Sequence, residues 1–127
     1  MTAVFVVSGG TGFSGEQLLR TALAQFPTAE VAITVIAGIR RSEQLENAVT
    51  QAAAANGLIV HTLVDAQLRL TLDRLARNRG VLAVDLMGPL LAQLQVVLDR
   101  EPVGRPGLYR EQNREAFERT EAIEFTL

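Results

Sequence analysis

The chain has 127 residues, of which 48% are apolar and 20% are charged, and its formal net charge is −2 at pH 7. This length fits one domain, and this composition predicts a folded chain rather than a disordered one. The negative charge argues against nucleic acid or an anionic membrane as the partner. No apolar run approaches the roughly 20 residues that cross a bilayer, and there is no cysteine. We therefore expect a cytoplasmic protein without disulfides and without a metal site.

All 12 basic residues are arginines, so the chain has no lysine. Lysine is required at the phosphate-binding position of a P-loop, in Schiff-base chemistry and in the Tyr-x-x-x-Lys pair of short-chain dehydrogenases. The sequence therefore excludes these three mechanisms, and it offers no catalytic residue that we can name.

A glycine-rich loop joins the first predicted strand to the first predicted helix. Val4 to Val7 is an apolar run typical of a buried strand. The helix is expected to start at Ser14 as its N-cap and to end at Pro27, with an inner face of Leu18, Leu19, Ala22, Leu23 and Phe26. Between strand and helix, Gly10-x-Gly12-x-x-Gly15 matches the dinucleotide-binding fingerprint.

Backbone N–H groups at such a helix start suit a phosphate or a carboxylate. The candidate ligand-binding residues of the loop are Ser8, Gly10, Thr11, Gly12, Ser14 and Gly15, and the candidate ligands are phosphate and ADP. The alternative is a tight turn that packs the helix onto the sheet and binds nothing. A P-loop is rejected, because Glu16 stands where its lysine is required.

Val31 to Ile36 is the second predicted strand, and Gly38 closes it. Arg40 and Arg41 follow at its carboxyl end, where dinucleotide folds that prefer NADP place an arginine against the 2′-phosphate. The alternative is a pair of solvated arginines that open the next helix.

The second helix is expected to start with Ser42 as N-cap and to end at Asn56-Gly57. Its predicted inner residues are Leu45, Val49, Ala52 and Ala53. Leu58 to Val64 forms the third predicted strand, with Asp65 after it. His61, inside this strand, is interpreted as a packed or edge histidine, because no second histidine or cysteine is present to share a metal.

The third helix is predicted to turn Leu68, Leu72, Leu75 and Ala76 inward and Arg69, Asp73 and Arg77 outward. Gly80 ends it, and Val81 to Val84 is a fourth strand that ends at Asp85. Pro89 suits the first turn of a fourth helix, whose predicted inner face is Leu90, Leu91, Leu94, Val97 and Leu98. After the irregular segment 100–108, a last helix is expected from about Glu111, burying Ala116, Phe117, Thr120 and Ile123.

This alternation of strands and helices predicts a three-layer α/β domain with a mainly parallel four-stranded sheet and helices on both faces, similar to a Rossmann fold. Ligands of such sheets bind outside the carboxyl ends of the strands. The glycine loop, Arg40, Arg41, Asp65 and Asp85 all fall at that edge, which makes them the candidate site. Helix capping is the alternative role of the two aspartates.

Several further blocks resemble one protein family over essentially the whole chain. The opening block is Ser8-Gly9-Gly10-Thr11-Gly12-Phe13-Ser14-Gly15-Glu16. The others are Gln25-Phe26-Pro27, Thr62-Leu63-Val64, Asp85-Leu86-Met87-Gly88-Pro89-Leu90, Arg105-Pro106-Gly107 and Glu121-Ala122-Ile123-Glu124-Phe125. Together they resemble the N-terminal half of the bifunctional kinase/pyrophosphorylase regulatory proteins, which control pyruvate phosphate dikinase and phosphoenolpyruvate synthase.

The resemblance implies ADP-dependent phosphorylation of a threonine on the target enzyme, and phosphate-dependent removal of that phosphate as pyrophosphate. In the family this chemistry belongs to a second domain with a P-loop, whereas this sequence ends at Leu127 without one. Gly9 also stands where the family has an acidic residue. We therefore expect a single domain over residues 1–127 that recognises the target enzyme or packs against a separate catalytic domain, without catalysing either reaction alone.

Two alternatives remain open at this point. The chain resembles epimerase-type and reductase-type NADP-binding domains over its first forty or so residues, so a small NADP-binding domain is the rival function. A second copy of the chain is the alternative partner, because apolar residues near the chain end, such as Phe125 and Leu127, are expected to leave apolar surface uncovered.

Overall fold

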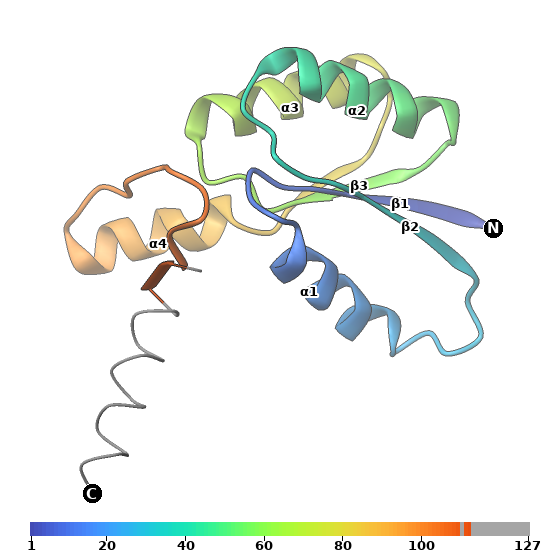
Figure 1. Cartoon of the computed structure of the whole chain (residues 1–127), viewed down its shortest axis with the longest axis horizontal. Helices are drawn as coiled ribbons and strands as arrows, with labels where there is room; N and C mark the ends of the chain where they lie inside the picture. The colour runs from blue at the N-terminus through green and yellow to red at the C-terminus, as the bar shows by residue number, and fades with distance from the viewer. Residues whose placement is uncertain (110, 113–127) are drawn as a thin grey trace, which may run out of the picture.

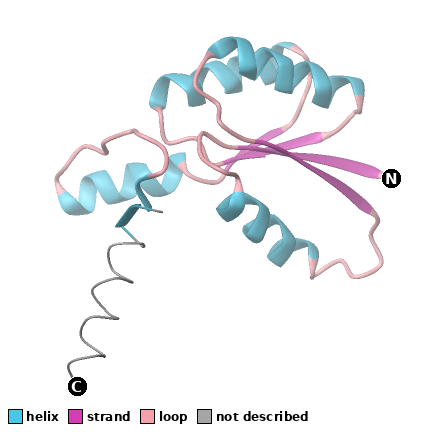
Figure 2. Ribbon diagram, viewed as in Figure 1, coloured by secondary structure: helices cyan, strands magenta, loops and turns pink. Residues whose placement is uncertain are grey.

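A computed structural model describes residues 1–109, 111 and 112 of the chain. Strands and helices alternate in the order β1 (Thr2–Val7), α1 (Phe13–Leu23), β2 (Val31–Ile36), α2 (Ser42–Ala54), β3 (Leu58–His61), α3 (Ala66–Asn78), β4 (Ala83–Asp85) and α4 (Gly88–Leu98). The strands pair in parallel in the order β2-β1-β3-β4. Helices α2 and α3 cover one face of the sheet and α1 covers the other (Figure 1, Figure 2). The predicted three-layer α/β fold is therefore confirmed.

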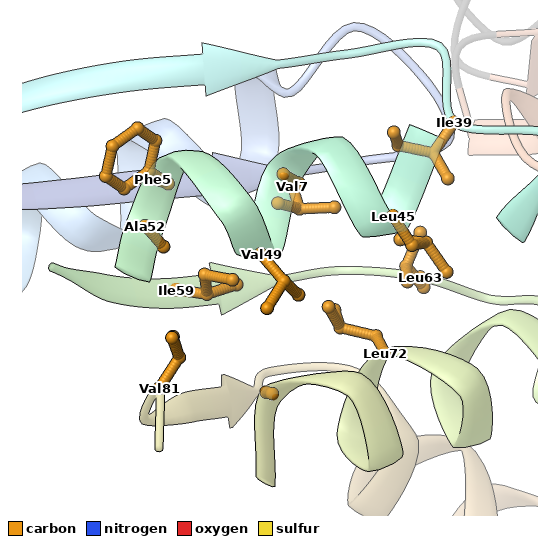
Figure 3. Packing of buried hydrophobic residues seen from close by; sticks show 12 residues of the cluster. Phe5, Val7, Ile39, Leu45, Val49, Ala52, Ile59, Leu63, Leu72 and Val81 are labelled. Atoms are coloured by element: carbon orange, nitrogen blue, oxygen red, sulfur yellow. The ribbon is translucent and has the colours of Figure 1, made fainter. Parts of the chain in front are cut away.

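The core lies on both faces of the two central strands, β1 and β3. On one face Phe5, Val7 and Ile59 pack with buried residues of α2 and α3, such as Leu45 and Leu72 (Figure 3). On the opposite face Val4, Val6 and Val60 pack with Leu19 of α1. Both faces are buried because helices cover both, and this explains the continuous apolar run of β1.

Three strand boundaries differ from the predicted ones. β1 begins at Thr2 rather than Val4. β3 ends at His61 rather than Val64, because its partner β1 ends at Val7, which is paired with His61. β4 begins at Ala83 rather than Val81. The N–H of Val81 donates to the carbonyl of Ala76 and so belongs to the turn that ends α3, where Gly80 has a φ of +67°. The predicted end of that helix at Gly80 is confirmed.

The predicted N-caps of the first two helices are wrong. Gly12, with φ +83°, precedes α1, so Ser14 lies inside its first turn. Arg41 precedes α2, and the side chain of Gln44 accepts hydrogen bonds from the N–H groups of Arg40 and Arg41 (2.7 and 2.9 Å). At the start of α1 a glycine with positive φ stands in the N-cap position, and at the start of α2 a glutamine inside the first turn makes the capping hydrogen bonds, where serine is a usual N-cap residue.

The ends and inner faces of α1 and α2 are predicted unequally well. In α2, Leu45, Val49 and Ala52 are buried, Ala53 is half-buried, and Asn56 with Gly57 ends the helix, as expected. Of the predicted inner residues of α1, only Leu19 is buried and Leu23 is half-buried, whereas Leu18, Ala22 and Phe26 are exposed. α1 also ends at Leu23, before Pro27 is reached.

Helix α4 does not pack on the sheet as predicted. Pro89 does lie in its first turn, but α4 has no buried residue. The predicted inner residues Leu90, Leu94, Val97 and Leu98 are 57%, 42%, 76% and 58% exposed, and only Leu91 is half-buried. The helix extends beyond the carboxyl ends of the strands instead of crossing back over the sheet (Figure 1). The apolar pattern indicated a face that needs a partner, but it did not identify which surface the partner offers.

The predicted last helix lies beyond the described residues, except for its first positions. Within the part of the chain that the structure describes, no helix combines the length and apolarity needed to cross a membrane.

Candidate functional site

The predicted site residues do gather at one edge of the sheet, where the parallel strands end. The glycine loop follows β1, Arg40 follows β2, Asp65 follows β3 and Asp85 ends β4. They form two separate groups at this edge. Arg40, Asp65 and one residue of the glycine loop, Gly9, line a small cavity, whereas Asp85 borders a larger one. None of the six loop residues predicted to bind a ligand lines either cavity.

Arg40 joins the glycine loop directly. Its Nη1 donates to the carbonyl oxygens of Gly9 and of Ile39. Pro106, from the segment after α4, packs against the loop, since a Cβ on Gly9 would lie 3.1 Å from the Cβ of Pro106. The cavity left between them has a volume of about 60 Å³. Its lining residues are Gly9, Ile39, Arg40, Leu63, Val64, Asp65, Leu68 and Pro106. A space of this size suits water or a small ion, whereas sites for larger ligands measure roughly 300–1,000 Å³.

The glycines of the fingerprint have packing roles that the structure makes visible. A Cβ on Gly12 would collide with Cγ1 of Val35 and would therefore project toward β2. A Cβ on Gly15 would lie 3.0 Å from Cγ1 of Val6 and 3.3 Å from Cγ2 of Thr62. Only Gly10 faces open space, with Oγ of Ser8 at 3.8 Å as the nearest atom. Close packing of α1 on the sheet therefore accounts for Gly12 and Gly15.

The hydroxyl groups of the loop differ in their surroundings. Ser8 is buried, and its Oγ accepts a hydrogen bond from the N–H of Gly10 (3.0 Å). Oγ1 of Thr11 accepts one from the N–H of Phe13 (3.3 Å). Ser14 is exposed and makes no capping hydrogen bond. The first two hydroxyls thus hold the loop in shape, which is compatible with a binding role and does not require one.

Asp65 and Arg41 show the alternative roles that the sequence left open. Oδ1 of Asp65 accepts a hydrogen bond from the N–H of Leu68 (3.0 Å), which makes Asp65 the N-cap of α3. The side chain of Arg41 is 70% exposed, and its Nη1 lies 3.9 Å from Oε2 of Glu43. Arg41 does not line either cavity.

Asp85 lies beside side chains that the sequence did not lead us to group with it. Its Oδ1 accepts hydrogen bonds from the N–H groups of Met87 (2.9 Å) and Gly88 (2.6 Å). Its Oδ2 lies 3.9 Å from Nε of Arg69, and its Oδ1 lies 4.0 Å from Nε2 of His61. Arg69 is only 19% exposed, so its predicted outward orientation is wrong. These residues border a cavity of about 420 Å³.

His61 is buried, with 4% of its surface exposed. Its Nδ1 accepts a hydrogen bond from the N–H of Leu63 (3.3 Å). Burial away from water lowers its pKa below the ordinary value, and nearby Arg69 acts in the same direction, while Asp85 and Asp73 oppose the shift. The side chain is therefore neutral at pH 7. The parallel pairing of His61 with Asp85 brings these two residues together. The predicted bounds of β3 and β4 did not indicate that His61 pairs with Asp85.

Comparison with known proteins gives a consistent match. The family model described as kinase/pyrophosphorylase matches residues 4–127. A pyruvate, phosphate dikinase regulatory protein of Chloroflexus aurantiacus is 47% identical over 124 residues, which are 98% of this chain and 44% of that protein. Proteins of the same kind from Trichlorobacter lovleyi and Syntrophomonas wolfei are 35% and 37% identical over all of this chain, and over 47% and 46% of their own lengths. The chain thus spans less than half the length of these curated relatives, in their N-terminal part.

Proposed function

Since the chain belongs to the kinase/pyrophosphorylase family, we propose that it acts as a target-recognition module in the control of pyruvate, phosphate dikinase or phosphoenolpyruvate synthase. The regulation would be the phosphorylation and dephosphorylation of a threonine on that enzyme, as the family resemblance implies. Support for the first target comes from the relatives, which are named pyruvate, phosphate dikinase regulatory proteins.

The observation that best supports a recognition role is the uncovered apolar surface of α4. Val96 and Val97 are each 76% exposed, Leu98 is 58% exposed, and α4 has no buried residue. Helix α4 makes no extensive contact with another helix or strand of the described residues. Large contiguous apolar patches on the surface of a protein usually mark a protein interface. We therefore propose that α4 docks on the target enzyme, with a separate catalytic domain as the alternative partner.

Sedimentation velocity with purified pyruvate, phosphate dikinase tests this proposal. We expect the chain to co-sediment with the dikinase. A variant in which Val96 and Val97 of α4 are replaced by glutamates should no longer co-sediment. A chain that associates only with a second copy of itself would instead assign α4 to a homodimer. Association with neither would contradict the docking role.

We also expect that the chain alone transfers no phosphate. It has neither a lysine nor the P-loop pattern to hold transferring phosphates. We propose that both the kinase and the pyrophosphorylase reaction need a separate catalytic domain. The check is incubation with pyruvate, phosphate dikinase and labelled ADP. Label on a threonine of the dikinase above a protein-free background would show that the chain is catalytic.

The rival function, an NADP-binding domain, has less support from the geometry. Arg40, the residue expected to meet the 2′-phosphate, donates to the carbonyl of Gly9. The adjoining cavity of about 60 Å³ is far below the range of dinucleotide sites. Phosphate or ADP at the glycine loop stays a proposal, and the small cavity favours neither, because it meets the loop only at Gly9.

A further inference from the structure

The cavity beside Asp85 is separate from the glycine loop and large enough for a small molecule. It lies between α3 and the ends of β3 and β4 and has a volume of about 420 Å³. Its lining residues are His61, Ala66, Arg69, Leu70, Asp73, Ala83 and Asp85. This volume falls within the range of small-molecule sites, which is roughly 300–1,000 Å³.

His61 offers this cavity a hydrogen-bond donor. Because its Nδ1 accepts from the N–H of Leu63, the proton of the neutral ring is assigned to Nε2. Oδ1 of Asp85 lies 4.0 Å from Nε2, which is beyond hydrogen-bond distance, and Nε2 makes no hydrogen bond within the described part of the chain. No fully buried side-chain nitrogen or oxygen of the described residues lacks a partner, so Nε2 is accessible to solvent although most of the ring is buried. Its N–H is therefore free to donate to a ligand in the cavity that His61 lines.

Arg69 adds a second group of donors. Its Nη1 is held by the carbonyl oxygens of Leu63 (3.2 Å) and Val64 (2.9 Å), which fixes the guanidinium in place. Its Nε and Nη2 make no hydrogen bond within the described part of the chain, and Nε lies 3.9 Å from Oδ2 of Asp85. A guanidinium side with two neighbouring N–H groups matches the geometry of phosphate and carboxylate oxygens.

The acceptors of the cavity are partly used. Oδ1 of Asp85 already accepts two backbone hydrogen bonds. Oδ2 of Asp73 is paired with Nη2 of Arg77 at 2.9 Å, and its Oδ1 makes no hydrogen bond within the described part of the chain. Oδ2 of Asp85 is left as an acceptor next to the donors of His61 and Arg69. A ligand held by these three residues should therefore bring acceptor oxygens to His61 and Arg69 and a donor to Asp85.

We propose that this cavity binds a small oxyanion that keeps a proton on one of its oxygens, with a phosphate group as the best fit. Its unprotonated oxygens accept from Nε2 of His61 and from the free side of Arg69. Its protonated oxygen donates to Oδ2 of Asp85. Inorganic phosphate is the best match, because its dianion keeps one proton at neutral pH, whereas a phosphate ester, with a second pKa of about 6, has mostly lost it. This inference does not depend on the docking role of α4.

His61 also supplies the measurement, because it is the only histidine of the chain. In the ¹⁵N-labelled protein its imidazole resonances report on Nε2 without overlap. Titration with inorganic phosphate is expected to shift the Nε2 resonance with saturation. Sulfate at the same concentrations is expected to shift it at least about tenfold more weakly, because sulfate has no proton at neutral pH and would meet an unpaired Asp85 carboxylate. Equal responses to the two ions, or none to phosphate, would overturn the proposal.

Two substitutions locate the binding groups. Arg69→Gln should abolish the phosphate response, whereas Arg74→Gln, an exposed change on the same helix, should leave it intact. Asp85→Asn should reduce the preference for phosphate over sulfate, since an amide no longer repels the unprotonated ion. If Arg69→Gln responds like the unchanged chain, the site is wrongly placed. The comparison of phosphate with sulfate uses the unchanged chain, so it decides the matter even if Asp85→Asn does not fold.

A third titration, with phosphothreonine, tests the need for the ligand's proton. The ester is mostly unprotonated at neutral pH, so it should shift the Nε2 resonance more weakly than inorganic phosphate does. Saturation at lower concentration than with inorganic phosphate would contradict the role given to Asp85.

Discussion

Gly88 lies where any side chain would collide with the carboxylate of Asp85. A Cβ at this position would also lie 3.2 Å from Nε of Arg69. The glycine therefore permits Asp85 and Arg69 to approach each other at the start of α4. We predict that Gly88→Ala lowers the free energy of unfolding by about 1–3 kcal/mol, the usual cost of forcing extra volume into a packed site.

The matched control for this change is Gly10→Ala. Its Cβ would have Oγ of Ser8 as nearest neighbour at 3.8 Å, which is an ordinary contact. Denaturant unfolding of both variants is the measurement, and the control should differ from the unchanged chain by less than about 1 kcal/mol. Equal losses in the two variants would contradict the role assigned to Gly88.

His61 should make the stability of the domain depend on pH. Burial lowers its pKa in the folded chain, so the unfolded chain takes up a proton first as the pH falls. The free energy of unfolding should therefore decrease as the pH falls through the ordinary histidine pKa of about 6.5, by at most about 1.4 kcal/mol per pH unit, until the lowered pKa is reached. Above pH 7 this contribution is complete and constant.

His61→Asn is the variant that isolates this effect, because an amide oxygen can still accept from the N–H of Leu63 but does not titrate. Unfolding should be followed by denaturant at pH 7.5, 6.5 and 5.5 in both proteins. The difference in unfolding free energy between them should shrink as the pH falls. A difference that stays constant over this range would show that His61 is protonated alike in both states.

The order of the strands and helices and the inner face of α2 were predictable from the sequence, whereas the inner face of α1 was only partly so and the position of α4 was not. The apolar run of β1 and the spacing of Leu45, Val49 and Ala52 in α2 reflect burial against the sheet core. The residues that the apolar pattern predicts to be buried are therefore the ones that are buried. The same period in α4 marks an apolar face, but no periodicity identifies the surface that covers it. The strand ends of β3 and β4 depend on the lengths of their neighbours, which a single segment does not contain.

The candidate site shows the same division. The place of the glycine loop, Arg40, Asp65 and Asp85 at one sheet edge follows from parallel topology and was predictable. The contact of Arg40 with Gly9 and the approach of Arg69 to Asp85 were not, because both join residues far apart in the sequence through side-chain orientation. Arg69 in particular has a charged side chain at a position that pattern alone assigns to solvent.

Helix α4 provides the prediction at the scale of an element. Val96→Glu together with Val97→Glu should change the free energy of unfolding by less than about 1 kcal/mol, because both side chains are largely exposed. The same pair should weaken binding to pyruvate, phosphate dikinase by at least about tenfold, since charges would enter an apolar interface. Unfolding by denaturant and calorimetric titration with the dikinase measure the two effects.

The control pair places the same charges on α2. Thr50→Glu together with Ala54→Glu alters two exposed positions of that helix. We expect binding to the dikinase to be unchanged by this pair. Equal weakening by both pairs would indicate a general charge effect rather than an interface on α4.

At the scale of the whole molecule, the sheet with α1, α2 and α3 forms a covered core, and α4 extends beyond the strand ends (Figure 1). The described domain therefore has a sheet whose two faces are covered by helices, and one helix, α4, without a partner among the described residues. This asymmetry is what the proposed recognition role explains.

Hydrogen–deuterium exchange of the chain, with and without pyruvate, phosphate dikinase, tests that role most directly. The amides of α4 (Gly88–Leu98) should exchange more slowly when the dikinase is present. The amides of α2 (Ser42–Ala54), which lies on a covered face of the sheet, should exchange at the same rate in both samples. Unchanged exchange in α4, or slowing confined to α2, would contradict the assignment of α4 as the docking surface.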